Sequence, residues 1–76
     1  MRDTILGIVD EIRPDIDFET ETALVDDGVL DSLDIVAIVA ALQDEFDVEI
    51  RAKDLIPENF NSVDAMEKLI TRLEEE

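Results

Sequence analysis

The chain lacks the residues that most often carry catalytic chemistry. Its 76 residues include no cysteine, histidine, tryptophan or tyrosine, and the three aromatic side chains are all phenylalanine. Without cysteine there is neither a disulfide framework nor a thiolate metal site, and nothing points to an oxidising compartment. Without histidine, no side chain has an ordinary pKa near neutrality and could serve as a general base. We therefore expect no self-activated nucleophile, no bound metal and no enzymatic activity.

Long apolar segments are also missing. No run approaches the ~18 apolar residues of a membrane-spanning helix. The chain starts Met1-Arg2-Asp3 without an apolar signal segment. We expect a cytoplasmic protein with no stable membrane association. Residues 1–76 are enough for one small domain, and a hydrophobic content of 46% allows a largely aliphatic core.

Basic residues are scarce. Six lysines and arginines stand against 22 acidic residues, which gives a formal net charge of −16. Nucleic acids and anionic membranes bind proteins through lysine and arginine, so neither is an expected partner. We expect a monomer whose partners present basic patches and bind more slowly as salt rises. The charge alone is as compatible with a role in keeping the protein soluble as with a role in attracting basic partners.

Apolar spacing predicts an all-α fold, a small bundle of three main helices plus one short helix. The first helix is expected to be capped by Asp3 or Thr4 and stopped by Pro14. Residues 14–30 form a long loop between the first two helices, and its scattered apolar residues should pack on the core. The main helices are expected at about Asp3 to Arg13, at Ser32 to about Phe46 and from near Asn61 or Ser62 onward, with the short helix at Ala52 to Leu55.

Charged side chains four residues apart on the last helix suggest solvated ion pairs. Asp64 precedes Lys68 by four residues, and Arg72 precedes Glu76 by four. Such pairs contribute only a few tenths of a kcal/mol each.

The helix expected at residues 32–46 has two apolar faces. At 100° per residue, one face is an ordinary core stripe made of Ile35, Ile38, Val39, Leu42 and Phe46. A different sector, which we call the docking patch, consists of Leu33, Val36, Ala37 and Ala40. A chain this small cannot easily enclose both faces, so the docking patch is expected to meet a partner. Acidic residues should rim it: Asp31, Asp34, Asp44 and Asp47. In the alternative reading, Val36 and Ala40 pack against another helix.

Ser32 lies at the start of this two-faced helix. Asp31 is a good N-cap, and Asp34 occupies the place of a capping-box acid, so a purely structural reading of Asp31-Ser32 is available. A phosphate ester on Ser32 would also suit a helix N-terminus, where free N–H groups and the dipole favour an anion. Because the chain has no base to deprotonate Ser32, activation has to come from a modifying enzyme.

The stretch from Gly28 to Asp34 (GVLDSLD), followed by an apolar helix and the stretch from Glu45 to Ile50 (EFDVEI), resembles the acyl carrier proteins. Size, acidity, helix order, the long first loop and the position of the motif all agree. The resemblance implies that Ser32, flanked by Asp31 and Leu33, carries 4′-phosphopantetheine, installed from coenzyme A by a phosphopantetheinyl transferase. It further implies a stand-alone carrier that holds an acyl or aminoacyl group as a thioester and shuttles it between loading and transferring enzymes.

Several positions depart from the pattern of fatty-acid carriers. Those carriers usually have an acid where this chain has Ala37, often an acid at Gln43, and commonly a bulky apolar residue at Ala40. The segments Gly28 to Leu30 and Phe60 to Ser62 look closer to D-alanyl and other aminoacyl carriers, which commonly have a less regular segment where this chain has residues 56–60. The resemblance therefore leaves both a role in fatty acid biosynthesis and a specialised or aminoacyl role open, and favours the latter.

Three other classes of function are weaker alternatives. A hydrolase would need Lys53 or Lys68 as the base for Ser32, and nothing in their spacing indicates it. Asp26-Asp27-Gly28 does not fit the register of a calcium-binding EF-hand loop. An unmodified acidic interaction module would explain the charge and the two-faced helix, but not the Asp31-Ser32-Leu33 motif in its setting.

Overall fold

Four helices and one short 3₁₀ turn make up the fold, and the three long helices form where the apolar spacing predicts them. The computed structural model describes residues 1–75 and has no strand within them. Its elements are α1 (Arg2–Ile12), α2 (Ser32–Phe46), the 3₁₀ turn η1 (Ala52–Asp54), α3 (Pro57–Phe60) and α4 (Val63–Glu74). The prediction of an all-α fold with three main helices is confirmed, and the expected limits of α2 are met. None of the helices in residues 1–75 is both long and apolar enough to span a bilayer.

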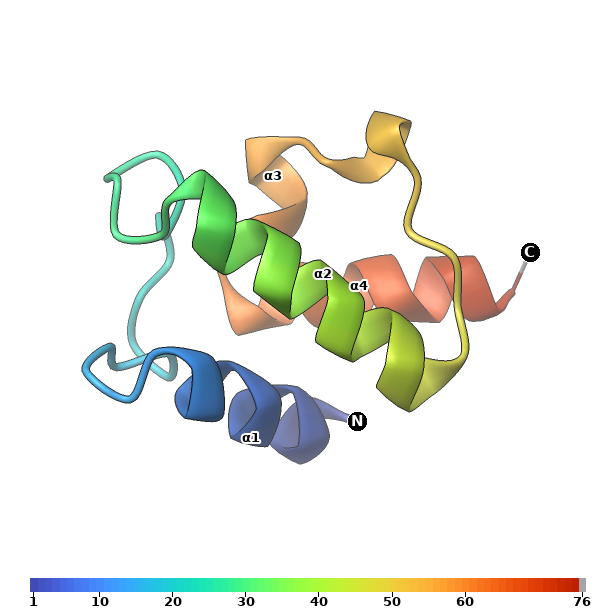
Figure 1. Cartoon of the computed structure of the whole chain (residues 1–76), viewed down its shortest axis with the longest axis horizontal. Coiled ribbons are helices and arrows are strands. Elements are labelled where there is room, and N and C mark those ends of the chain that lie inside the picture. Colours follow the sequence, from blue (N-terminus) through green and yellow to red (C-terminus); the bar gives the residue numbers. More distant parts are fainter. Residues whose placement is uncertain (76) are drawn as a thin grey trace.

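The three long helices enclose one aliphatic core. α1 packs against both α2 and α4, and α3 packs against α4. In Figure 1, α2 crosses the front of the molecule with α1 beside it, while η1 and α3 lie on the other side of α2. The buried apolar side chains come from all four helices, from the long loop and from the segment after α2: Ile5, Val9, Phe18, Leu24, Leu30, Ile38, Leu42, Ile50, Phe60, Val63, Met66, Leu69 and Ile70.

The start of α1 differs from the prediction. Met1 occupies the N-cap position and no side chain caps the helix, so the expected cap by Asp3 or Thr4 is wrong. Both residues lie inside the first turn instead. The end is as expected, because the residue before a proline is disfavoured in the helical conformation. Arg13 has left that conformation (φ −136°, ψ 80°), and Pro14 follows it.

Two short elements connect α2 to α4. The expected turn at Ala52 is confirmed as η1. The segment after it, which the sequence left irregular, forms α3 from Pro57 onward. Proline suits the first position of a helix, where its missing N–H would have no partner and its φ is already helical. The chain therefore has one more short helix than was predicted.

The long loop from residue 13 to 31 is held to the rest of the fold. Phe18, Leu24 and Leu30 are buried, and the remaining apolar side chains expected there, Ile16 and Val29, are partly buried against the core. The Asn61 side-chain oxygen accepts hydrogen bonds from the backbone N–H groups of residues 25 and 26, both at 3.0 Å. Its backbone oxygen accepts from the Leu24 N–H at 2.9 Å. The loop that leads to Ser32 is thus anchored just before α4.

The ion pairs of α4 connect helices rather than turns of one helix. Asp64 pairs with Arg2 of α1, so the predicted role of Asp64 as a partner of Lys68 is not what the structure shows. Arg72 pairs with the buried Asp54 of η1 at 3.6 Å. The pair predicted between Arg72 and Glu76 lies outside the described residues.

Candidate functional site

Ser32 is the first residue of α2, and its neighbour provides the helix cap. The Asp31 carboxylate accepts a hydrogen bond from the Asp34 N–H at 2.9 Å, and the Asp34 carboxylate accepts from the Asp31 N–H at 3.2 Å. This reciprocal capping box confirms the predicted cap. The Ser32 side chain is exposed, and within residues 1–75 its hydroxyl makes no hydrogen bond. The hydroxyl is therefore not used by the fold.

The start of α2 suits a phosphate ester. The first N–H groups of a helix lack partners within the helix and carry the positive end of its dipole. Here the N–H groups of Ser32 and Leu33 have no hydrogen-bond partner among the described residues, while the N–H groups of Asp34 and Ile35 bond to Asp31. Two nearby carboxylates, those of Asp31 and Asp34, would repel an arriving phosphate. The second of them is paired with a cation.

That cation is Arg13, which the sequence did not single out. Its Nη1 donates to the Asp34 carboxylate at 2.5 Å and reaches the Val29 carbonyl oxygen at 3.5 Å. Its Nε and Nη2 donate to the two oxygens of Asp15 at 3.0 and 2.9 Å. Arg13 and Asp34 are 21 residues apart, so no local spacing rule could have paired them. The Asp34 side chain, expected at the rim of the docking patch, is only 14% exposed because Arg13 covers part of it.

The pKa values around Arg13 reflect these contacts. Hydrogen bonds to Asp15 first, and to Asp34 second, raise the pKa of the Arg13 guanidinium further above its already high value. The hydrogen bond from Arg13 lowers the pKa of the Asp15 carboxyl. Arg13 and Asp15 are therefore both charged throughout the physiological pH range. The Arg13 guanidinium thus stays a cation in its contact with Asp34.

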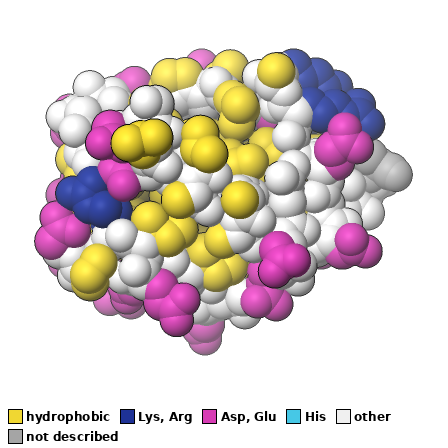
Figure 2. Space-filling model, in the orientation of Figure 1, with side chains coloured by type: hydrophobic (Ala, Val, Ile, Leu, Met, Phe, Trp, Pro, Cys, Tyr) yellow, Lys and Arg dark blue, Asp and Glu magenta, His cyan; other side chains and the backbone are white. Residues whose placement is uncertain are grey.

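The docking patch is exposed along the front of α2. Leu33 is 77% and Val36 64% exposed, and Ala37 and Ala40 are exposed as well. The alternative that Val36 and Ala40 pack against another helix is wrong. Figure 2 shows hydrophobic side chains gathered over α2 at the centre of this face, with acidic side chains around them. Apolar side chains that gather into a contiguous exposed patch often mark an interaction site.

The other expected rim acids are exposed but differ in position. Asp31 lies at the start of α2 beside Ser32, and Asp44 follows Ala40 by one helical turn on the same face. Asp47 is the last cap of α2 and adopts the left-handed conformation (φ 53°), which aspartate tolerates. It borders a separate cleft. The structure therefore brings Asp31 and Asp44 to the docking patch, and places Asp47 beyond it.

Leu55 extends the apolar surface and was missed by the sequence reading. It is 47% exposed, and the neighbouring Ile56 is 43% exposed. Leu55 closes one side of a shallow groove of about 200 Å³ whose floor is α2, lined by Ile35, Val36, Val39, Ala40, Gln43 and Leu55. The adjacent apolar pair before Pro57 was the signal available in the sequence. Its position opposite α2 could not be read from spacing.

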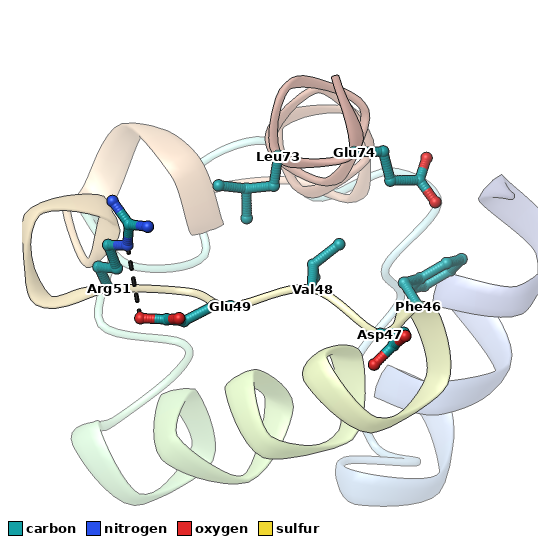
Figure 3. A pocket seen from close by; sticks show the side chains of 7 residues that line it. All are labelled: Phe46, Asp47, Val48, Glu49, Arg51, Leu73 and Glu74. Atoms are coloured by element: carbon teal, nitrogen blue, oxygen red, sulfur yellow. Dashed lines mark ion pairs between the residues drawn. The ribbon is translucent and has the colours of Figure 1, made fainter. Parts of the chain in front are cut away.

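A cleft of about 530 Å³ lies at the opposite end of α2 (Figure 3). Its walls are the last turn of α2, the segment after it and the end of α4, with the lining Phe46, Asp47, Val48, Glu49, Arg51, Leu73 and Glu74. Glu49 pairs with Arg51 at 3.4 Å. Since a helix rises 1.5 Å per residue, this cleft is roughly 20 Å from Ser32. Within residues 1–75, no group of three or more acidic side chains is arranged to hold a metal ion there or elsewhere.

A helical chain that offers an unused serine hydroxyl at a helix start, beside an exposed apolar face, has the architecture of a carrier protein. The family model described as "Phosphopantetheine attachment site" matches residues 3–70. The chain belongs to this family, and its cofactor is 4′-phosphopantetheine. It is also 33% identical, over 66 residues, to aminoacyl carrier protein 1 of Bradyrhizobium diazoefficiens, with 87% of this chain and 72% of that protein covered. No solved structure matches the chain significantly. The resemblance to acyl carrier proteins is thereby confirmed.

Proposed function

We propose that residues 1–76 form a single non-catalytic carrier domain, cytoplasmic and monomeric, in which Ser32 bears the 4′-phosphopantetheine. The observation that carries the assignment is the contrast between the serines of the chain, Ser32 and Ser62. The Ser62 hydroxyl is half-buried and accepts a hydrogen bond from the Ala65 N–H at 3.1 Å, so it is used as a helix cap. The Ser32 hydroxyl is exposed and makes no hydrogen bond within the described residues.

The residues around Ser32 have different roles in holding the 4′-phosphopantetheine. The free N–H groups of Ser32 and Leu33 favour the phosphate through the helix dipole. Asp31 caps the helix through its own side chain, so the cap does not use the serine hydroxyl. When bound, the cofactor supplies the terminal thiol that this cysteine-free chain lacks, and with it the means to hold a carried group as a thioester. The chain itself contributes attachment, orientation and recognition.

The docking patch is where we place the partner enzymes: the phosphopantetheinyl transferase and the enzymes that load and transfer the carried group. The patch is apolar at its centre, with Asp31 and Asp44 beside it, on a chain of net charge −16. A partner with an apolar centre and a basic rim complements it. The small patch implies a modest interface, and a shuttle has to dissociate from each partner in turn. Nucleic acid remains an unexpected partner.

An aminoacyl group is our preferred cargo. Support comes from the similarity to a protein named aminoacyl carrier protein 1 and from Ala37 and Ala40, which leave the docking patch flatter and less acidic than the fatty-acid pattern. A fatty-acyl cargo is the alternative. Protein purified from its native cells and treated with hydroxylamine, which cleaves thioesters, distinguishes them. We expect release of an amino acid hydroxamate, and release of a fatty hydroxamate would overturn the preference.

The attachment itself is tested by intact mass after incubation with coenzyme A, magnesium and a broad-specificity phosphopantetheinyl transferase. We expect the wild-type chain to gain one phosphopantetheine, Ser62→Ala to gain it as well, and Ser32→Ala to gain none. No gain by folded wild-type protein would contradict the proposal and favour an unmodified acidic interaction module. A gain by Ser32→Ala would move the attachment to another residue.

A further inference from the structure

Arg13 ties the end of α1 to the chain on both sides of Ser32. Its Nη1 donates to Asp34, two residues after Ser32, and contacts the carbonyl oxygen of Val29, three residues before it. The side chains of Arg13 and Asp34 are 30% and 14% exposed, so the pair is partly withdrawn from solvent. Ion pairs of this kind are screened less by salt than exposed ones.

The guanidinium has little capacity left for another ligand. Of its five N–H groups, one at Nε and one at Nη2 go to Asp15, and those of Nη1 go to Asp34 and Val29. Two carboxylates already contact it, so their negative charge exceeds its single positive charge. Arg13 is therefore built to hold protein groups in place and not to receive a phosphate itself.

What Arg13 holds is the cap of the helix that carries Ser32. The same Asp34 oxygen, Oδ2, accepts from Arg13 Nη1 and from the Asp31 N–H. Arg13 thereby fixes the Asp34 side chain in the orientation that the capping box requires. Because the first turn of a helix is the part that frays most readily, an external contact there restricts the positions open to Ser32.

We propose that Arg13 is a positioning residue for the modification of Ser32. This inference rests on the proposed function. By fixing Asp34, Arg13 keeps the first turn of α2 formed, so that the Ser32 hydroxyl is presented in one orientation to the transferase. By pairing with Asp34, it also reduces the repulsion that the incoming phosphate meets from this carboxylate. Orientation of a reacting group is worth large factors in rate even when the residue responsible is remote.

Steady-state modification kinetics test the proposal through the split between kcat and KM. For Arg13→Ala we expect kcat to fall roughly threefold to tenfold. KM should not rise, because removing a positive charge cannot weaken the attraction to a basic partner. Arg13→Lys keeps a cation for Asp34 but loses the two-pronged contact to Asp15, so its kcat should lie between those of wild type and Arg13→Ala.

Arg2→Ala is the matched control. It removes the same charge and breaks a more exposed ion pair, the one with Asp64 between α1 and α4, away from Ser32. We expect its kcat to stay within a factor of about 1.5 of wild type, since exposed ion pairs contribute little. An equal fall of kcat in Arg2→Ala and Arg13→Ala would overturn the inference, because general destabilisation would then explain both.

Amide hydrogen exchange provides a readout that is independent of modification. Arg13→Ala should exchange the Asp31 and Asp34 amides faster than wild type, with the amides of α4 unchanged. If the transferase does not modify the wild-type protein, the proposed function is refuted.

If the wild-type protein is modified, but kcat and amide exchange are the same in Arg13→Ala and Arg13→Lys as in wild type, only the role of Arg13 is refuted.

Discussion

The start of α2 and the start of α4 use serine in opposite ways. At α4, Ser62 is the cap, and its hydroxyl accepts the Ala65 N–H. At α2 the cap is Asp31, so Ser32 falls one position inside the helix, exposed and with its hydroxyl unused among the described residues. A displacement of one residue relative to the cap therefore decides whether a serine hydroxyl serves the fold or is available for chemistry.

The two helix starts also differ in the contacts that hold them to the rest of the chain. Before α4, the Asn61 side chain bonds to the long loop, and Asn61→Ala tests this anchor. The variant leaves two backbone N–H groups, those of Val25 and Asp26, without their acceptor. We expect a loss of about 2 kcal/mol in the free energy of unfolding, measured by urea denaturation. Asn59→Ala, which removes a single hydrogen bond to the Asp54 carbonyl oxygen, is the control and should lose about half as much. Equal losses would contradict the anchoring role.

The caps themselves should matter less than this anchor. We expect Ser62→Ala and Asp31→Ala each to lose about 1 kcal/mol of stability in the same measurement, because each removes a side-chain acceptor at a helix start. Asparagine caps a helix about as well as aspartate, so Asp31→Asn should lose much less than Asp31→Ala. A loss in Asp31→Asn as large as that in Asp31→Ala would show that the charge, and not the cap, stabilises α2.

Ser32→Ala should have a smaller effect still on stability. Its hydroxyl makes no hydrogen bond within residues 1–75, so we expect a change below about 0.5 kcal/mol. Thermal and urea denaturation beside Ser62→Ala make the comparison direct. A loss equal to that of Ser62→Ala would mean that both serines serve the fold, and would remove the contrast on which the assignment of Ser32 depends.

The smallest expected effect is a change in the pKa of the Asp15 carboxyl when Arg13 is replaced. The hydrogen bond from Arg13 lowers the pKa of Asp15 in the folded state. A lowered pKa stabilises the fold above the ordinary aspartate value of about 3.9 and ceases to do so as the pH falls through the folded pKa. In Arg13→Ala, carboxyl NMR titration should therefore show the Asp15 pKa rising toward its ordinary value. An unchanged pKa would show that Arg13 does not hold Asp15 in solution.

Local rules predicted α2, its cap and its exposed apolar residues better than the long-range contacts that support them. The capping box and the limits of α2 follow from residue types three positions apart, and the exposure of Leu33 and Val36 follows from helical periodicity. These features depend only on the order of residues within one helix. The same rules missed α3, because a four-residue helix leaves no periodicity to detect.

The contacts of Arg13 and Asn61 could not be predicted for a physical reason. Asn61 meets Val25 across 36 residues and Arg13 meets Asp34 across 21, so each depends on how the helices pack. The partial burial of Asp34 has the same origin. Its sequence position marks it as a surface acid, and only the approach of α1 turns it into a partly buried partner of Arg13.

Peptide mapping of the modified wild-type chain tests the contrast between the two serines most directly, since it needs no variant. Trypsin does not cut between Arg13 and Pro14, so digestion places Ser32 in the peptide 3–51 and Ser62 in the peptide 54–68. We expect the phosphopantetheine on the first peptide, and tandem mass spectrometry should locate it on Ser32. A group on the second peptide, or on another residue of the first, would contradict the assignment.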